Sequence, residues 1–288
     1  MYGEFKNKKK LSTRAAAAEV IAKVLRGQSL SALLPEYSGK VDEKDRPLLK
    51  ELCFGSLRWY PQIAIILKGL IEKPLREKDL EIQGLLASGI YQLMHMRIAE
   101  YAIINETVSA VGNLNRPWAK GLVNAVLRNF QRQQQDILDK EAENLVFQTA
   151  HPKWLLKKIN DAWPSEIASQ IIKANNQRAP MTLRVNGLHT SREDYLSTLE
   201  DAGIVASATD YSAQGVLLET PRDVTELPGF SDGDISVQDE AAQFAAHLLL
   251  LGSGQRVLDA CCAPGGKTCH ILESQPDLTS LLAIDLEP

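Results

Sequence analysis

The 288-residue sequence predicts a multidomain fold: an all-α domain over residues 1–140, a small α/β domain over 141–235 and the start of a doubly wound α/β domain over 236–288. Three observations support this prediction. Apolar residues recur at helical spacing between residues 12 and 135, with no convincing strand signal among them. Helical and alternating patterns are mixed after residue 140. Near residue 260, a short apolar strand leads through a glycine turn into a helix, as in the first unit of a doubly wound sheet.

The charge of the chain is unevenly distributed. The formal net charge is −4, and 44% hydrophobic with 24% charged residues describes an ordinary globular protein. Residues 1–140 contain 22 Lys and Arg against 15 Asp and Glu, a balance of +7, whereas residues 141–288 contain 10 against 21, a balance of −11. A basic first half predicts a polyanionic partner for that half, and the alternative is a merely solvated basic face.

The cysteine pattern and the hydropathy predict a cytoplasmic protein without membrane contact. The four cysteines are Cys53, Cys261, Cys262 and Cys269, and none has the C-x-x-C spacing of many metal sites. Reduced thiols are expected in a chain of this size. No apolar run approaches the roughly 18 residues of a membrane helix, and the start lacks the apolar core of a signal peptide. Met1–Leu11, with four lysines, predicts a mobile basic arm, and a monomer is expected.

The first domain is predicted to contain six or seven helices. Ser12 is placed to cap a helix that ends at Gly27. Further helices are expected around residues 49–57, 63–71, 82–93 and 105–112, and after Pro117. In the last of these, Lys120, Asn124 and Arg128 recur every four residues and share one face, which could contact phosphates. The polar stretch Gln131–Glu143 predicts a frayed helix end and a linker, with the domain boundary near residue 140.

The middle domain is predicted from a strand, a helix and two further strands. These are expected at Met181–Val185, Ser191–Ala202, Gly203–Ser207 and Gly215–Glu219, after two helices that follow His151. His151 is expected to cap or pack, since no acid or nucleophile pattern surrounds it. Arg178, Arg184 and Asn186 are the candidate contacts of this domain to a partner, although the domain is acidic. Ile235–Val237 is expected to be a strand that precedes a helix over Glu240–Leu251, with Asp239 placed to cap this helix.

The cofactor unit begins with a strand at Val257–Asp259 and a helix at Lys267–Glu273. Leu281–Asp285 is expected to be a second strand ending in an acid, where such folds place a ribose-binding carboxylate. A phosphate-binding loop would need glycine at Cys261, and the G-x-G-x-x-G fingerprint of dinucleotide sites is missing. What remains is a nucleoside cofactor without a pyrophosphate, and S-adenosyl-L-methionine fits this description. The predicted cofactor-binding residues are Cys261, Cys262, Ala263, Pro264, Gly265, Gly266, Lys267 and Asp285.

Several motifs resemble one family. The run Val257–Thr268 looks like the cofactor motif of RNA cytosine carbon-5 methyltransferases, and Pro180–Asn186 and Val237–Gln243 resemble other stretches of these enzymes. Glu51–Arg58 and Lys120–Arg128 are similar to the RNA-binding antitermination factor NusB. Together they resemble the Sun/Fmu (RsmB) type of 16S ribosomal RNA methyltransferase. The resemblance implies a NusB-like first domain, an RNA-binding middle domain with Arg178, Arg184 and Asn186 as candidate RNA contacts, and 16S ribosomal RNA as partner. It also implies a Rossmann-like cofactor domain with Gln238 and Asp239 at the edge of its pocket, as the alternative to a simple helix cap at Asp239.

In this family, a cysteine of a Thr-Cys motif attacks carbon-6 of the base, assisted by an Asp-Ala-Pro-Cys motif. Both motifs are expected beyond Pro288, so no catalytic residue is assigned within the chain. Cys261 and Cys262 are poor candidates because they lie in the cofactor turn. We therefore expect RNA binding, weak cofactor binding and no methyl transfer by these 288 residues, and marginal stability of 236–288 in isolation. The alternative is a non-catalytic RNA-binding, antitermination-like module with a vestigial cofactor motif.

Overall fold

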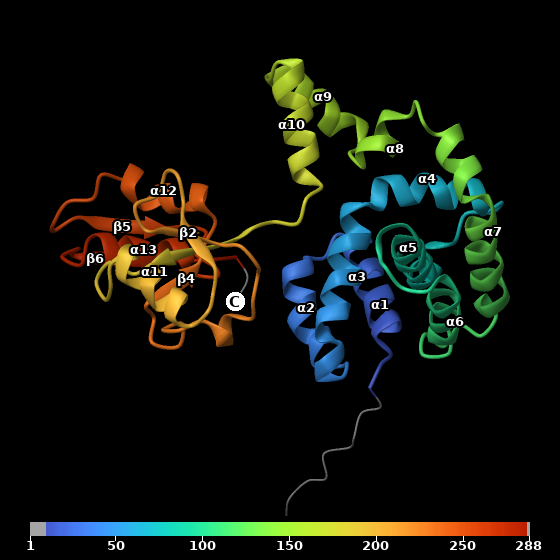
Figure 1. The fold of residues 1–288 in the computed structure, drawn as a ribbon, viewed down its shortest axis with the longest axis horizontal. Helices are drawn as coiled ribbons and strands as arrows, with labels where there is room; N and C mark the ends of the chain where they lie inside the picture. Colours follow the sequence, from blue (N-terminus) through green and yellow to red (C-terminus); the bar gives the residue numbers. More distant parts are fainter. Residues whose placement is uncertain (1–9, 287–288) are drawn as a thin grey trace, which may run out of the picture. The chain divides into compact units, whose positions relative to one another are not determined.

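The computed structural model describes residues 10–286, so nearly all of the predicted basic arm lies outside the described residues. The chain divides into two compact units, Met1–Gln177 and Arg178–Pro288, here called the N-terminal unit and the C-terminal unit (Figure 1). Each has a hydrophobic core of its own. The boundary does not coincide with the predicted boundaries near 140 and 235, and the three-domain division stays a prediction.

The N-terminal unit confirms the predicted all-helical start. Its first seven α-helices are α1 (Thr13–Leu25), α2 (Leu30–Ser38), α3 (Arg46–Arg58), α4 (Tyr60–Leu70), α5 (Leu80–His95), α6 (Glu100–Ala110) and α7 (Ala119–Lys140). The Ser12 hydroxyl accepts the Ala15 N–H, so α1 is capped as predicted. Residues 131–140, expected to fray, form regular helix at the end of α7.

The core of this unit is built around α1 and α5. Four consecutive alanines of α1, Ala15 to Ala18, are fully buried and leave little room between the helices. On α5, a Cβ added to Gly84 would lie 2.5 Å from the Ala18 carbonyl oxygen, so only glycine permits this approach. Cys53 on α3 belongs to the same core, and its side chain is fully buried.

Three more helices complete the N-terminal unit: α8 (Leu145–Thr149), α9 (Lys153–Ala162) and α10 (Ser165–Asn175). His151 is buried between them, as expected of a packing residue. Its Nδ1 lies 2.6 Å from the Thr149 carbonyl oxygen and its Nε2 lies 3.2 Å from the Asn175 amide nitrogen. Both ring nitrogens of His151 therefore have hydrogen-bond partners within the N-terminal unit. None of the described helices is long and apolar enough to span a bilayer.

The C-terminal unit begins with a four-stranded antiparallel sheet in the order β2-β3-β1-β4. Its elements are β1 (Met181–Val185), α11 (Arg192–Asp201), β2 (Ala206–Ala208), β3 (Gly215–Leu218) and β4 (Ile235–Val237). The predicted elements are confirmed to within a few residues, including the Ser191 cap of α11. However, β4 pairs with β1, so a domain boundary at residue 235 would cut through a strand of this sheet.

Strand β1 is buried on both faces. Leu183 and Val185 point to one face and pack with Tyr195 and Leu199 of α11. Arg184, like Thr182, points to the opposite face and is buried too. That second face is covered by elements that follow the sheet in sequence.

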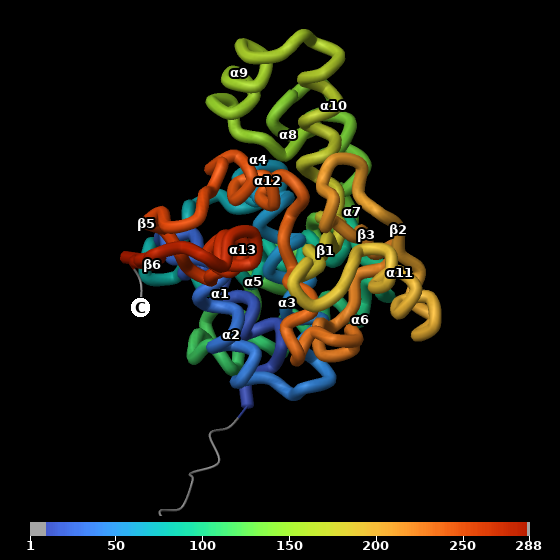
Figure 2. Tube along the Cα trace, turned by 90° about the vertical axis from the view of Figure 1, so that its left-hand side faces the viewer, coloured from blue at the N-terminus to red at the C-terminus, as the bar shows by residue number. Residues whose placement is uncertain are grey.

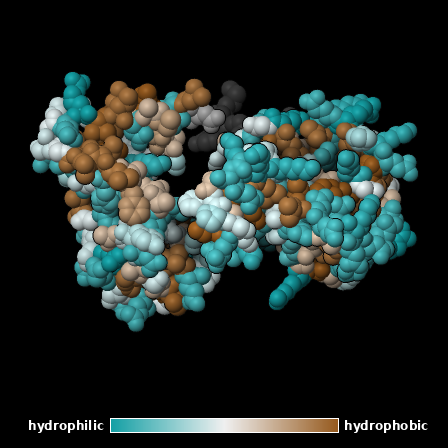
Figure 3. All heavy atoms as spheres, turned by 90° about the horizontal axis from the view of Figure 1, so that it is seen from above, coloured by the Kyte–Doolittle hydropathy of each residue, from teal (hydrophilic) through white to brown (hydrophobic). Residues whose placement is uncertain are grey.

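The remaining elements are α12 (Glu240–Leu248), β5 (Arg256–Asp259), α13 (Gly266–Ser274) and β6 (Ser280–Ala283). β5 and β6 form a parallel pair with α13 alongside (Figure 2). The Asp239 carboxylate accepts the Ala241 N–H and caps α12, as one of the two predictions for this residue proposed. Brown apolar patches reach the surface in the space-filling view (Figure 3). Leu258 and Leu282 of the two-stranded sheet are 57% and 60% exposed.

Candidate cofactor turn and RNA-facing residues

The candidate cofactor turn connects β5 to α13. Gly265 precedes the helix with φ +96° and ψ −4°, a conformation that L-residues rarely adopt. A Cβ at this position would have no atom within 4 Å, so the backbone conformation and not crowding requires glycine. The first N–H groups of α13, a helix of nine residues, lie at this corner.

Asp285 lies beside the turn, as the sequence predicts. The parallel register places Asp259 opposite Ala283, so the ends of the two strands meet at one edge. The Asp285 carboxylate accepts the Ala263 N–H at 2.8 Å. The Cys262 N–H, 3.1 Å from the Ile284 carbonyl oxygen, ties the turn to the same segment. The glycine corner and the acidic strand end therefore form one local structure.

Asp259 and Thr268 stabilise the turn through side-chain hydrogen bonds. The sequence analysis did not predict this role for either residue. The Thr268 hydroxyl donates to Asp259 Oδ2 at 2.6 Å, and the Cys261 N–H lies 3.3 Å from Oδ1. Asp259 thus joins the end of β5 to the first turn of α13. A carboxylate at a strand end, with a threonine nine residues later in the following helix, was the signal available in the sequence.

The thiols around the turn differ from the thiol in the helical core. Cys261 and Cys269 are exposed and Cys262 is half-buried. Burial raises the pKa of Cys53 to about 12, which keeps this thiol protonated and unreactive at neutral pH. Lys267 is exposed on α13, and Ala263 and Pro264 are exposed in the turn, joined by a cis peptide bond.

These residues fit a nucleoside cofactor. The open glycine corner offers backbone N–H donors, and the Asp285 carboxylate, a group that can accept several hydrogen bonds, lies at the same corner and accepts the Ala263 N–H with Oδ2. No group of three or more His, Cys, Asp and Glu suited to a metal ion occurs among residues 10–286.

Arg184 is not an RNA contact, contrary to the prediction. Its side chain is fully buried on the second face of β1. It forms a two-pronged ion pair with Glu273 of α13, with Nε–Oε2 and Nη2–Oε1 distances of 3.1 and 2.7 Å. Nη1 donates to the Gly266 carbonyl oxygen at 2.8 Å and to the Gln238 side-chain oxygen. RNA cannot reach a guanidinium enclosed in this way.

Two further buried side chains link the four-stranded sheet to α12 and α13. The Gln243 amide donates to the carbonyl oxygens of Leu183, at 3.2 Å, and Gln238, at 3.1 Å. His270 of α13 is fully buried, with Nε2 2.8 Å from Gln214 Oε1. Its Nδ1 has no hydrogen-bond partner within the described part of the chain. Burial, Arg184 and His247 lower the pKa of His270 to about 4, so the ring is neutral at physiological pH.

The other candidate RNA contacts are mostly accessible. On α7, Lys120 and Asn124 are exposed and Arg128 is half-buried, with Nη1 3.2 Å from Gln131 Oε1. Arg178 is exposed at the start of the C-terminal unit. Asn186 is half-buried in the turn after β1, where its amide donates to the Gly233 carbonyl oxygen and its oxygen accepts the Leu188 N–H.

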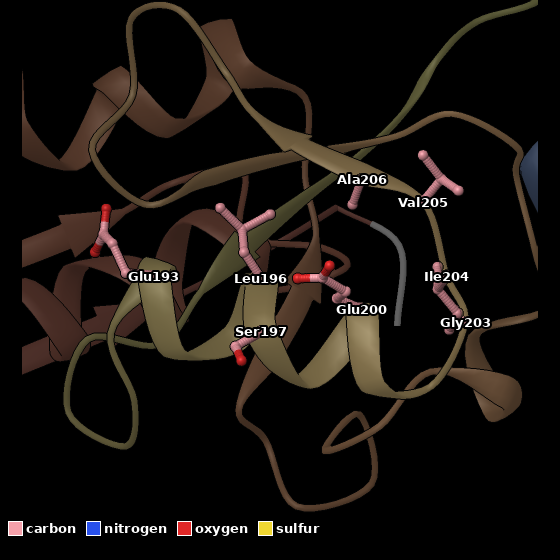
Figure 4. A pocket seen from close by; sticks show the side chains of 8 residues that line it. All are labelled: Glu193, Leu196, Ser197, Glu200, Gly203, Ile204, Val205 and Ala206. Carbon is pink, nitrogen blue, oxygen red and sulfur yellow. The ribbon is translucent and has the colours of Figure 1, made fainter.

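A hollow in the C-terminal unit lies away from these residues. Figure 4 shows its lining side chains, which come from α11 and from the segment that leads into β2. They are Glu193, Leu196, Ser197, Glu200, Gly203, Ile204, Val205 and Ala206. None is a predicted site residue, and two carboxylates oppose the binding of an anionic ligand. The candidate site therefore remains at the glycine turn.

Three family models match consecutive parts of the chain. The NusB family matches residues 11–132, a ferredoxin-like domain of RsmF/B-like methyltransferases matches 151–225, and 16S rRNA methyltransferase RsmB/F matches 246–288. The fold resembles the crystal structure of PH0851, with a TM-score of 0.73 at 20% identity, over 97% of this chain and 65% of that one.

Curated relatives match almost the whole chain. Ribosomal RNA small subunit methyltransferase B of Pseudomonas syringae pv. tomato is 50% identical over 96% of this chain and 62% of its own length. The protein of that name from Serratia proteamaculans is 47% identical, over 97% of this chain and 65% of its own length. The probable enzyme of Coxiella burnetii is 44% identical, over 96% and 63%. The chain thus spans 62 to 65% of the length of these relatives. With its family models in this order and this level of identity, the chain is similar over almost its whole length to proteins named ribosomal RNA small subunit methyltransferase B.

Proposed function

We propose that this chain supplies the RNA-binding part and the cofactor turn of an S-adenosyl-L-methionine-dependent methyltransferase that acts on carbon-5 of a cytosine in 16S ribosomal RNA. The hydrogen bond between Asp285 and Ala263 is the observation that carries the proposal. This hydrogen bond joins the glycine turn to the acid that follows the second parallel strand, and such an arrangement is suited to a nucleoside cofactor. The similarity to the RsmB/F family model and to the curated relatives supports the reaction class and the RNA substrate.

The turn is proposed to bind the cofactor mainly through its backbone. The N–H groups at the start of α13 donate to the carboxylate of the methionine part, and Asp285 accepts from the ribose hydroxyls. Lys267, exposed at the same corner, is placed to pair with that carboxylate. When bound, S-adenosyl-L-methionine supplies a methyl group activated by its positive sulfur. Cys261 and Cys262, in the turn itself, contribute backbone contacts and shape.

No cysteine of this chain is proposed as the nucleophile. Addition to carbon-6 of cytosine needs a thiolate that reaches the base beside the cofactor. Cys53 lies in the helical core and the other three cysteines lie in the turn or in α13. We therefore propose that these 288 residues bind RNA and cofactor without transferring the methyl group.

The RNA surface is proposed to include Lys120, Asn124 and Arg128 of α7, with Arg178 and Asn186 in the C-terminal unit. Lys and Arg would neutralise phosphates and so supply affinity more than sequence reading. Arg184 is excluded from this surface by its burial.

The direct test measures binding and transfer separately. Calorimetry with S-adenosylhomocysteine should detect binding to the purified chain. Incubation with radiolabelled S-adenosyl-L-methionine and unmodified 16S RNA should leave the RNA unlabelled. Labelled RNA would contradict the proposed lack of a nucleophile. RNA binding with no detectable affinity for S-adenosylhomocysteine would instead favour the non-catalytic RNA-binding module.

A further inference from the structure

Arg184 is a charged side chain buried in the middle of a sheet. It has no exposed surface, and β1 lies between β3 and β4. A guanidinium carries its charge at any physiological pH, so burial is tolerated only where its donors and its charge are satisfied. Glu273, whose side chain is 11% exposed, meets the charge with two hydrogen bonds.

A buried ion pair alone does not show that its residues have a functional role. The cost of removing two charges from water often cancels their attraction, and such pairs can be replaced by apolar residues without loss of stability. The third nitrogen of Arg184 distinguishes this case, because it donates to the Gly266 carbonyl oxygen as well as to Gln238. Gly266 is the first residue of α13 and follows the positive-φ Gly265 directly.

Arg184 therefore holds α13 at two separated points. Gly266 and Glu273 are seven residues apart, which is about 10 Å along a helix. Two attachments at that distance restrict both the sliding and the rotation of the helix against β1. The contact at Gly266 acts at the corner where the turn Cys262–Gly265 enters the helix. A lysine, with a single ammonium, cannot form the fork to Glu273 and the bond to Gly266 together.

We propose that Arg184 is a positioning residue that sets the cofactor turn relative to the four-stranded sheet, and so couples this sheet, which carries the proposed RNA contact Asn186 directly after β1, to the cofactor site. Gln238 of the segment between β4 and α12 accepts from the same nitrogen and fixes its direction. The cofactor part of this inference rests on the proposed function, whereas the effect on the turn does not.

The experiment removes the charge pair as a unit, so that no buried charge is left behind. The variant Arg184→Met/Glu273→Met keeps apolar volume at both sites, and Arg222→Met, which changes an exposed arginine of the same unit, is the matched control. Amide hydrogen exchange of the whole chain is measured by mass spectrometry for peptides over residues 260–270 and over α11. Affinity for S-adenosylhomocysteine is measured by calorimetry.

In the double variant, exchange over residues 260–266 should rise about tenfold, with α11 unchanged, and the affinity should fall about tenfold, the order expected for removal of a charge-assisted hydrogen bond. The control should match the wild type in both. Arg184→Lys should restore neither property. Unchanged exchange in the turn, or faster exchange with unchanged affinity, would overturn the inference and leave a structural ion pair. Should the wild type not bind S-adenosylhomocysteine, the proposed function fails while the exchange result still decides whether Arg184 positions the turn.

Discussion

The carboxylate of Asp285 accepts a hydrogen bond from the backbone of Ala263, 22 residues earlier, at 2.8 Å. One acid thus organises the turn and, under the proposed function, also accepts from the ribose of the cofactor. The two roles can be separated by substitution, because an amide can still accept from an N–H group but carries no charge.

Asp285→Asn should keep the turn ordered, whereas Asp285→Ala should loosen it. Both should lower the affinity for S-adenosylhomocysteine, the alanine variant by about tenfold or more, since a charged acceptor is removed. Calorimetry measures the affinity and amide exchange at Ala263 reports on the turn. Wild-type affinity in Asp285→Ala would contradict a ribose contact at this position.

Gly265→Ala should impair the cofactor turn through backbone strain, because φ is +96° and nothing crowds the new methyl group. The expected loss of stability is about 1 kcal/mol. Gly254→Ala is a matched control, with φ +75° and no close neighbour but outside the turn. Both variants should melt at similar temperatures, and only Gly265→Ala should lose cofactor affinity. Equal affinities in the two would argue against a role of this corner in binding.

His270 should make the C-terminal unit sensitive to acid. Its folded-state pKa, about 4, lies below the unfolded value near 6.5, so the unfolded chain binds more protons between these values. The free energy of unfolding should therefore fall as the pH drops from about 6.5 to about 4, by at most about 3 kcal/mol. Scanning calorimetry at several pH values should show a weaker dependence for His270→Gln. The exposed His189→Gln is the control, and parallel curves for wild type and His270→Gln would refute this account.

The row on α7 should contribute to RNA affinity by neutralising phosphates. Replacing Lys120 and Arg128 with Gln should weaken binding to 16S RNA fragments and lower the slope of log affinity against log salt by about one for each phosphate that is no longer neutralised. Lys140→Gln, an exposed lysine at the far end of the same helix, should have little effect. Filter binding over a salt series measures both quantities. Identical slopes in the row variant and the control would mean that this face is only solvated.

Local patterns allowed much of this fold to be predicted. The helical repeats, the caps at Ser12, Ser191 and Asp239, and the glycine turn depend on residues close together in sequence, and the structure confirms them. The proximity of Asp285 to the turn could be predicted because parallel strands end at the same edge.

Arg184 and β4 show where such reasoning fails. In an alternating strand a polar position suggests solvent, yet the second face of β1 is covered by elements more than 50 residues later in the chain. Likewise the partner of β4 is β1, also about 50 residues away, and no local signal assigns it to that sheet. The burial of Arg184 and the pairing of β4 with β1 both depend on contacts between residues far apart in the sequence. Neither residue spacing nor composition reveals such contacts.

The burial of β1 on both faces limits how the molecule can be recombined. A chimaera that joined residues 236–288 to a foreign domain would leave Glu273 without Arg184 and would disrupt the four-stranded sheet at β4. A workable graft would have to carry Met181–Val185 and Ile235–Gln238 along with α13. Under the proposed function, specificity for a new RNA should therefore be sought by exchanging loops on this sheet, with strand β1 kept unchanged.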